Sequence, residues 1–165
     1  PEHPGTVITG APGASRPVTS IAYKERQTIV TLSSTRMFEQ AGFLAEVFAA
    51  VGRHEIVVDM VATSEVSLSF TTHDQRGLAA ALAELRALGE VAIHPGKSIL
   101  VVVGQQIAAS PGIGARILRA IADAGVNVEM LSHAAGSINL SMALDDADIP
   151  RAVPLLHRVL FEDAS

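Results

Sequence analysis

The sequence contains an internal repeat with one constant spacing, and this repeat restricts the possible folds more than any other feature. Three segments of the first copy align with three segments of the second copy without a slip in register. The aligned pairs are residues 29–32 with 99–102, 42–48 with 112–118, and 56–61 with 126–131. One apolar match is common by chance, but three matches at one spacing indicate two copies of one structural unit.

Each copy has the pattern of a small unit of strands and helices. β-branched runs at residues 29–32 and 99–103 predict a buried strand in each copy. Apolar residues then recur at every fourth position and predict a helix; they are Phe43, Val47 and Val51 in the first copy and Ile113, Ile117 and Ile121 in the second. Two further strands are predicted in each copy, at residues 57–61 and 66–70 and at residues 126–131 and 137–142.

The first copy continues with a leucine-rich helix predicted at residues 78–88 and a last strand at residues 91–93, before a turn at Pro95 and Gly96. Its element order is therefore β-α-β-β-α-β. This order is typical of the ferredoxin-like α+β fold, in which helices cover one face of a four-stranded sheet. The second copy ends in a helix predicted at residues 149–160 and lacks the last strand.

A strand predicted at residues 18–23 has no place in the first copy. Two copies of the repeat do not fill the whole chain, and the remainder is about as long as the N-terminal stretch that contains this strand. The simplest fold uses the strand to complete the sheet of the second unit, so that the first unit is nested within the second. We therefore predict one unit at residues 26–96 and a second at residues 18–25 plus 97–163. Residues 1–17, rich in Pro, Gly, Ser and Thr, are predicted to be a linker.

The composition excludes several classes of protein. The net charge is −5 and no basic cluster is present, so nucleic acid is not an expected partner. The absence of Cys excludes a disulfide scaffold, thiol chemistry and Cys-ligated metals. The apolar runs are too short to span a bilayer, and no signal-peptide pattern is present, so we expect no membrane partner and a cytoplasmic location. Because the chain begins at Pro1, we expect it to be a piece of a longer protein.

No motif in the chain predicts a catalytic site. Gly96, Lys97 and Ser98 resemble the end of a phosphate-binding loop, but Val91 stands where that motif requires a glycine. The six histidines are isolated from one another and have no metal-ligand spacing. We therefore predict no catalytic residues, no metal and no cofactor for this chain, and a chain that is not itself an enzyme.

The two copies differ in their polar residues. Asp59 interrupts an apolar strand, and the turn after it carries Ser64 and Glu65; the second copy has Glu129 opposite Asp59 but two alanines opposite Ser64 and Glu65. These acceptors suit an ammonium group, and the free N–H groups of a helix beginning near Gly42 suit a carboxylate. The pattern fits an amino-acid site, and it equally fits a solvated turn beside an ordinary helix start.

Residues 35–48, 53–60 and 62–67 resemble the paired ACT domains at the C-terminus of aspartate kinases. The most specific part is Thr-Ser-Glu-Val-Ser at residues 63–67, which is more similar to the lysine-sensitive monofunctional enzymes than to the threonine-sensitive fusions. The resemblance covers nearly the whole chain. It implies two ACT domains with the nested arrangement, preceded by a kinase domain that phosphorylates the β-carboxylate of aspartate. ATP and Mg are expected only in that absent domain.

The resemblance also implies an effector site in the first ACT domain, at a dimer interface, with L-lysine as the feedback inhibitor of lysine, threonine, methionine and diaminopimelate synthesis. The carboxylate of the bound lysine is expected at the backbone amides of residues 42–44. Its ammonium groups are expected at Asp59, Ser64 and Glu65. The implied site residues are Met37, Gly42, Phe43, Leu44, Val58, Asp59, Ser64 and Glu65. Two alternatives stay open: a threonine-sensing module, and a module that only holds two subunits together.

Overall fold

A computed structural model describes residues 17–38 and 40–162 and shows one six-stranded antiparallel sheet with four α-helices. The strand order across the sheet is β2-β3-β1-β4-β6-β5. The strands are β1 (Ser20–Ser33), β2 (Met60–Thr63), β3 (Ser67–Thr72), β4 (Glu90–Val103), β5 (Met130–Ser132) and β6 (Asn139–Asp145). The helices are α1 (Phe43–Arg53), α2 (Leu78–Arg86), α3 (Ile113–Asp123) and α4 (Ile149–His157), and α4 continues into a π-helical turn at Arg158–Glu162. The predicted α+β class is confirmed.

The two long strands β1 and β4 belong to both halves of the molecule. The end of β1 pairs with β3, whereas its beginning pairs with the end of β4, as in the pair Ile21↔Val102. The predicted N-terminal strand therefore does complete the sheet of the second half. Residues 1–16 of the predicted linker and the end of the second unit at 163 lie outside the described residues.

The prediction of a turn at Pro95 and Gly96 is wrong, because β4 runs through these residues without a break. In the same way, the strands predicted at 18–23 and 29–32 are parts of one strand, β1. Each long strand changes direction at a residue with positive φ, Arg26 (φ 59°) in β1 and Gly96 (φ 71°) in β4, and the β1–β4 register shifts there. A bulge re-aims a strand without ending it, so turn residues inside a strand can mark a bulge.

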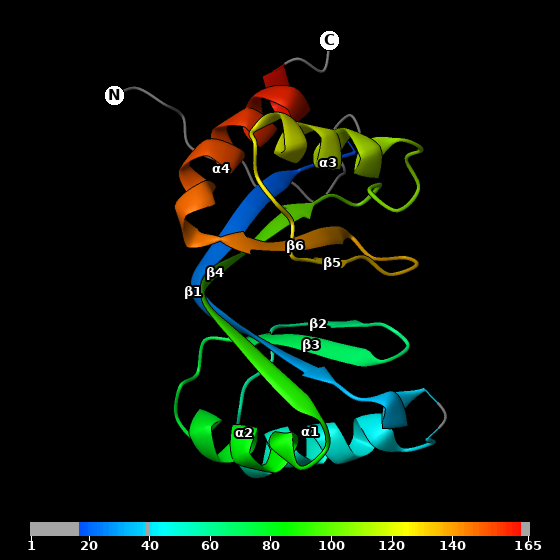
Figure 1. Cartoon of the computed structure of the whole chain (residues 1–165). Helices are drawn as coiled ribbons and strands as arrows, with labels where there is room; N and C mark the ends of the chain where they lie inside the picture. Colours follow the sequence, from blue (N-terminus) through cyan, green and yellow to red (C-terminus); the bar gives the residue numbers. More distant parts are fainter. Residues whose placement is uncertain (1–16, 39, 163–165) are drawn as a thin grey trace.

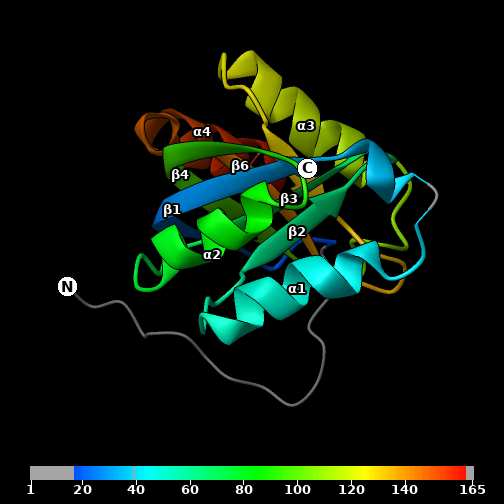
Figure 2. The same ribbon diagram turned by 60° about the horizontal axis from the view of Figure 1, so that its bottom comes forward.

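Helices cover the outside of each half (Figure 1). Helices α1 and α2 lie on the side of β2 and β3, and α3 and α4 lie on the opposite side, against β5 and β6. Each pair of helices closes its own apolar core, with Phe70 and Leu85 among the buried residues of the first and Leu100 and Ile117 among those of the second. Figure 2 shows α1 lying beside β2 in the first half. Within the described residues, none of the helices is long and apolar enough to cross a membrane.

A third, smaller core lies between the two halves. Its buried residues are Ile29, Met60, Ile99, Met130 and Ala143. Ile29 and Ile99 are equivalent positions of the sequence repeat, and so are Met60 and Met130. The two halves therefore present equivalent residues to each other, as an internal twofold relation requires.

The repeat spacing is not constant along the chain. Helices α1 and α3 keep the spacing of the sequence repeat. Met60 pairs with Thr71, however, whereas Met130 pairs with Ala143, so the spacing from β3 to β6 is two positions longer. The connection from β5 to β6 is therefore two residues longer than the equivalent connection from β2 to β3. By this longer spacing, His73 of the first half is equivalent to Asp145 of the second.

The positive φ of Gly96 can be tested by substitution. A Cβ at this position would meet no atom within 4 Å, so Gly96→Ala adds conformational strain without a clash. We expect Gly96→Ala to lower the free energy of unfolding by about 1 kcal/mol, measured by urea denaturation. Gly52→Ala is a matched control, because a Cβ there also meets no atom but Gly52 lies in helix α1 with ordinary φ. The control should stabilise the chain by up to about 1 kcal/mol, and equal effects would contradict the bulge interpretation.

Candidate functional site

The predicted site residues lie in two groups at opposite ends of β2. Asp59 directly precedes the strand, and Ser64 and Glu65 directly follow it. Five steps along an extended chain place Asp59 and Ser64 about 16 Å apart. The interpretation that these acceptors form one cluster within a single chain is therefore wrong, because the strand between them is extended and separates them.

The first group surrounds the turn between β2 and β3. The Ser64 hydroxyl lies 2.7 Å from the Ser67 hydroxyl and accepts hydrogen bonds from the backbone N–H groups of Val66 and Ser67, at 3.4 and 3.1 Å. The Glu65 side chain is exposed and forms no ion pair with the described residues. Glu65 is thus the carboxylate available at this end of β2.

The start of α1 lies at the same end. The backbone N–H of Ser34 donates to the Val66 oxygen at 2.8 Å and ties the loop before α1 to the β2–β3 turn. Gly42 (φ 86°) is the N-cap, and no side chain caps the helix. Among the described residues, the N–H groups of Leu44 and Ala45 donate to no backbone oxygen. These N–H groups and the helix dipole favour a carboxylate.

Three more residues shape this helix start. Phe43 is buried in the first core, Met37 packs against that core, and Leu44 is exposed. The guanidinium of Arg36 lies 5.7 Å from the centre of the Phe43 ring and pairs with Glu46 at 3.4 Å. A cation and free backbone donors therefore meet at an apolar surface, which suits the carboxylate end of an amino acid.

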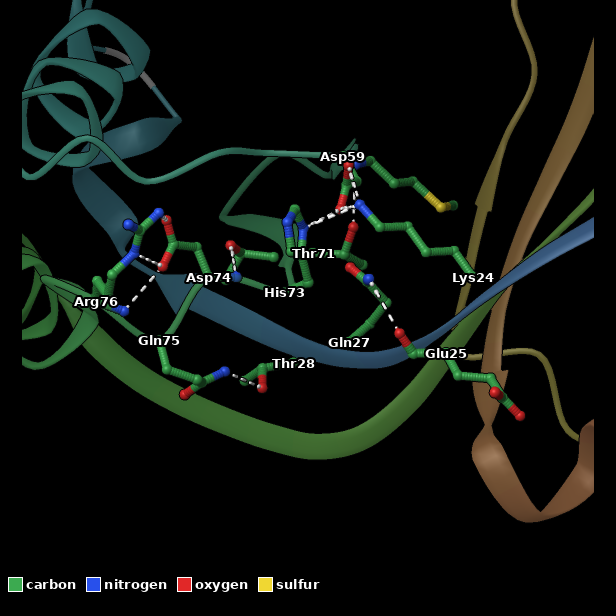
Figure 3. Close-up of polar contacts among 12 residues, drawn as sticks. Lys24, Glu25, Gln27, Thr28, Asp59, Thr71, His73, Asp74, Gln75 and Arg76 are labelled. Carbon is green, nitrogen blue, oxygen red and sulfur yellow. Dashed lines mark hydrogen bonds and ion pairs between the residues drawn. The ribbon is translucent and has the colours of Figure 1, made fainter.

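The second group surrounds Asp59 (Figure 3). Lys24, from β1, donates from Nζ to both carboxylate oxygens of Asp59, at 2.9 and 2.7 Å, and Nζ lies 2.9 Å from Nδ1 of His73. Nδ1 of His73 in turn lies 3.1 Å from Oδ2 of Asp59. Val58, the last predicted site residue, packs against the first core. The Asp59 carboxylate thus holds an ammonium group, and the group comes from the chain itself.

The contacts of His73 depend on whether its Nδ1 carries a proton. An ammonium group has only donors, so Lys24 can bond to Nδ1 of His73 only when Nδ1 carries no proton. When Nδ1 carries a proton, it can donate to Asp59 instead, and the contact with Lys24 is lost. Partial burial alone would raise the pKa of the Asp59 carboxyl, but the hydrogen bonds and charges of Lys24 and His73 outweigh it and hold the pKa below its usual value.

The second half contains an equivalent ammonium site. Lys97 donates to the carboxylates of Glu129 and Asp145, the latter at 2.6 Å. Glu129 matches Asp59 by the repeat, and Asp145 matches His73. Burial alone would lower the pKa of Lys97, but the two carboxylates outweigh it and raise the pKa above its usual value. Lys97 is therefore held as a charged group.

The two halves differ in how deeply the lysine is held. The Lys97 side chain is 11% exposed, and the Lys24 side chain is 46% exposed. The residue equivalent to Lys97 in the first half is Gln27, which pairs with Lys97 across β1 and β4. Gln27 is 1% exposed, and its Oε1 has no hydrogen-bond partner among the described residues. A buried lysine in one half is thus replaced by a buried glutamine and an exposed lysine in the other.

Sequence reasoning found Asp59 and Glu129 but missed Lys24, Gln27 and His73. The isolated positions of the six histidines give no sign that His73 contacts Lys24. The match between His73 and Asp145 was hidden because the spacing between the copies grows by two positions before it reaches them. In the described residues, no group of His, Asp and Glu could hold a metal ion.

Comparison with known proteins places these features in a family. The sequence model of the ACT domain matches residues 30–86 and 100–160. The lysine-sensitive aspartokinase 3 of Escherichia coli is 33% identical over 151 residues, which cover 87% of this chain and 33% of the relative. The chain spans about a third of the length of the curated relatives it matches.

Two solved structures show the same fold. Aspartokinase III of E. coli in complex with lysine and aspartate, in its T-state, superimposes with a TM-score of 0.78 and 32% identity, over 90% of this chain and 34% of that one. The ligand-free regulatory subunit of aspartate kinase from Thermus thermophilus superimposes with a TM-score of 0.76 and 27% identity, over 88% of this chain and 99% of that one.

The difference between the two lysines predicts a difference in stability. Lys97→Met leaves two carboxylates close together without their cation, and we expect it to lower the free energy of unfolding by at least about 2 kcal/mol. Lys24→Met breaks a more exposed ion pair and should cost less than about 1 kcal/mol. Chemical denaturation of both variants at neutral pH checks this order, and a larger cost for Lys24→Met would contradict it.

The lowered pKa of Asp59 predicts a pH dependence. A carboxyl whose pKa is lower in the folded chain stabilises the fold above its unfolded pKa of about 3.9 and loses this effect as pH falls through the folded value. Asp59→Asn should therefore lower the free energy of unfolding most at neutral pH and progressively less below about pH 4. Urea denaturation at pH 7 and pH 3 measures the difference, and a cost independent of pH would show that the charge of Asp59 plays no part.

Proposed function

The chain belongs to the ACT domain family, and from this premise we propose that it is the regulatory part of an aspartate kinase that binds L-lysine between two copies of the chain. Lysine binding would lower aspartate phosphorylation by a kinase domain of the same polypeptide. That reaction, with its ATP and Mg, belongs to the kinase domain, and the two ACT domains supply the sensing. The effect would be feedback inhibition of the pathway to lysine, threonine, methionine and diaminopimelate.

One observation carries this proposal: the two groups of site residues lie at opposite ends of an edge strand. Strand β2 is the first strand of the sheet, so one of its sides pairs with no described strand. A second copy can pair with this side in antiparallel orientation, around a twofold axis. An axis that passes between Val61 and Ala62 places Asp59 of one copy opposite Ser64 of the second copy. Two half-sites that are separate in one chain then come together in a dimer.

The surface around β2 supports such a dimer. Val57 and Val66, which flank the strand, are 50% and 44% exposed, and Leu44 and Phe48 on the neighbouring helix α1 are also exposed. Apolar side chains beside an unpaired edge are typical of a surface that another chain covers. The homodimer is thus part of the proposal, and it creates two equivalent sites.

The charges of the combined site fit a basic amino acid. Its carboxylate would lie at the free N–H groups of α1, near Arg36, and its ammonium groups would lie at Glu65 and Ser64 of the same copy and at Asp59 of the other. Threonine has no second ammonium group and would leave one of the acidic residues without a cation. The E. coli aspartokinase with lysine bound has the same fold over 90% of this chain, and this similarity supports lysine as the effector.

Isothermal titration calorimetry tests the effector. We expect the chain to bind L-lysine with measurable heat and to show no comparable response to L-threonine at the same concentration. Asp59→Asn should abolish lysine binding while sedimentation still detects the dimer. A response to threonine alone would make this a threonine-sensing module, and a dimer that binds neither amino acid would leave only the structural role.

A mixing experiment tests whether each site is shared between copies. In chains carrying Asp59→Ala or Glu65→Ala alone, every shared site lacks one carboxylate. Random mixing gives heterodimers with one intact site and one site that lacks both, so about a quarter of all sites should bind lysine again. A site contained within one chain would recover no binding. The double variant Asp59→Ala/Glu65→Ala mixed with itself is the matched control and should stay inactive.

A further inference from the structure

The structure assigns Lys24 a role as an internal competitor: its ammonium group occupies the place at Asp59 and His73 that the effector's ammonium group must take. This inference rests on the proposed function, because it concerns affinity at the same site. Lys24 would therefore set how much effector is needed, and it would favour effectors that carry a cationic group able to replace it.

The geometry around Asp59 is that of a filled ammonium site. Lys24 Nζ makes two hydrogen bonds to the Asp59 carboxylate, at 2.9 and 2.7 Å, and approaches His73 Nδ1 at 2.9 Å. A free primary ammonium group offers the same three donors. An effector ammonium group can reproduce each of these contacts, but only after Lys24 has left.

In the equivalent site of the second half, the ammonium group comes from a lysine that is largely buried, Lys97. The chain has two lysines, Lys24 and Lys97, and each places Nζ at the equivalent carboxylate of its half. Lys97 projects from the buried position that Gln27 occupies in the first half, whereas Lys24 reaches Asp59 from three residues earlier and is 46% exposed. Of the two lysines, Lys24 is thus the one that solvent, and a ligand, can reach.

Gln27 leaves an unused acceptor beside the site. Its Oε1 is buried and has no partner among the described residues. Thr28 of β1 pairs with Thr72 of β3 in antiparallel register. Gln27, one residue earlier in β1, therefore lies opposite His73, one residue later than Thr72. In Figure 3 the Gln27 amide lies near Thr71 and on the side of the Asp59 and Lys24 pair. A buried acceptor without a partner favours a ligand that brings an additional donor.

The carboxylate of the neighbouring residue Asp74 is held by another group. Asp74 follows His73 in the chain, but its carboxylate is bonded to the side chain and backbone N–H of Arg76, at 2.9 to 3.1 Å (Figure 3). Asp59 is therefore the carboxylate for which Lys24 and a ligand compete.

Calorimetry with matched variants tests the competition. Lys24→Met removes the competitor, and we expect L-lysine to bind up to about fivefold more tightly, as the loss of one exposed ion pair allows. Lys24→Arg keeps a cation and should bind lysine much as the unmodified chain does. Arg86→Met is the control for net charge, because it removes one positive charge from the exposed end of α2 and should leave affinity unchanged.

Nuclear magnetic resonance observes the displacement directly. In a chain labelled with ¹⁵N at the lysine side chains, the two Nζ signals report Lys24 and Lys97 separately. Unlabelled L-lysine should shift the Lys24 signal toward that of a solvated ammonium group and leave the Lys97 signal in place.

The outcomes separate this inference from the proposed function. Lysine binding with a weaker affinity in Lys24→Met, or with an unchanged Lys24 signal, overturns the competition and leaves the proposed function standing. Binding to Lys24→Met but not to the unmodified chain supports both, with a stronger competitor than expected. Absence of lysine binding to every variant overturns both proposals.

Discussion

The pairing of β1 with β4 is the constraint on which the rest of the structure depends. Each strand has 14 residues, and each contributes one part to the first half-sheet and the other part to the second. Both half-sheets therefore share these two strands, which makes the sheet one continuous hydrogen-bonded network. The bulges at Arg26 and Gly96 allow these strands to pass from one half to the other without ending. The helices, the three cores and both ammonium sites take their positions from this framework.

The two halves have the same scaffold but different polar chemistry. In the second half, a buried lysine neutralises Glu129 and Asp145, and the residues equivalent to Ser64 and Glu65 are not a hydroxyl and a carboxylate. In the first half, an exposed lysine covers Asp59, and the other acceptors lie at the far end of β2. A duplicated unit can thus keep its fold in both copies while only one copy has an exposed lysine at its carboxylate.

The sequence predicted the fold better than it predicted the site. The repeat and the apolar periods identified both helix pairs and the use of the N-terminal strand, because these depend on spacing along the chain. The turn at Pro95 and Gly96 was wrong because the same residues also suit a bulge. The contacts of Lys24, Gln27 and His73 could not be predicted, because they depend on which strands become neighbours and on a register that differs between the two copies. The separation of Asp59 from Ser64 followed only from the extended geometry of β2.

The small core between the halves has a mechanical consequence. Two of its five buried residues are methionines, Met60 and Met130, and each begins the edge strand of its half. A methionine side chain is unbranched and rotates about several bonds, so it refills space after a small displacement at little cost. The contact between the halves is therefore soft where the shared strands are stiff. A change in angle between the halves would bend the molecule at this contact while the hydrogen bonds of β1 and β4 stay intact.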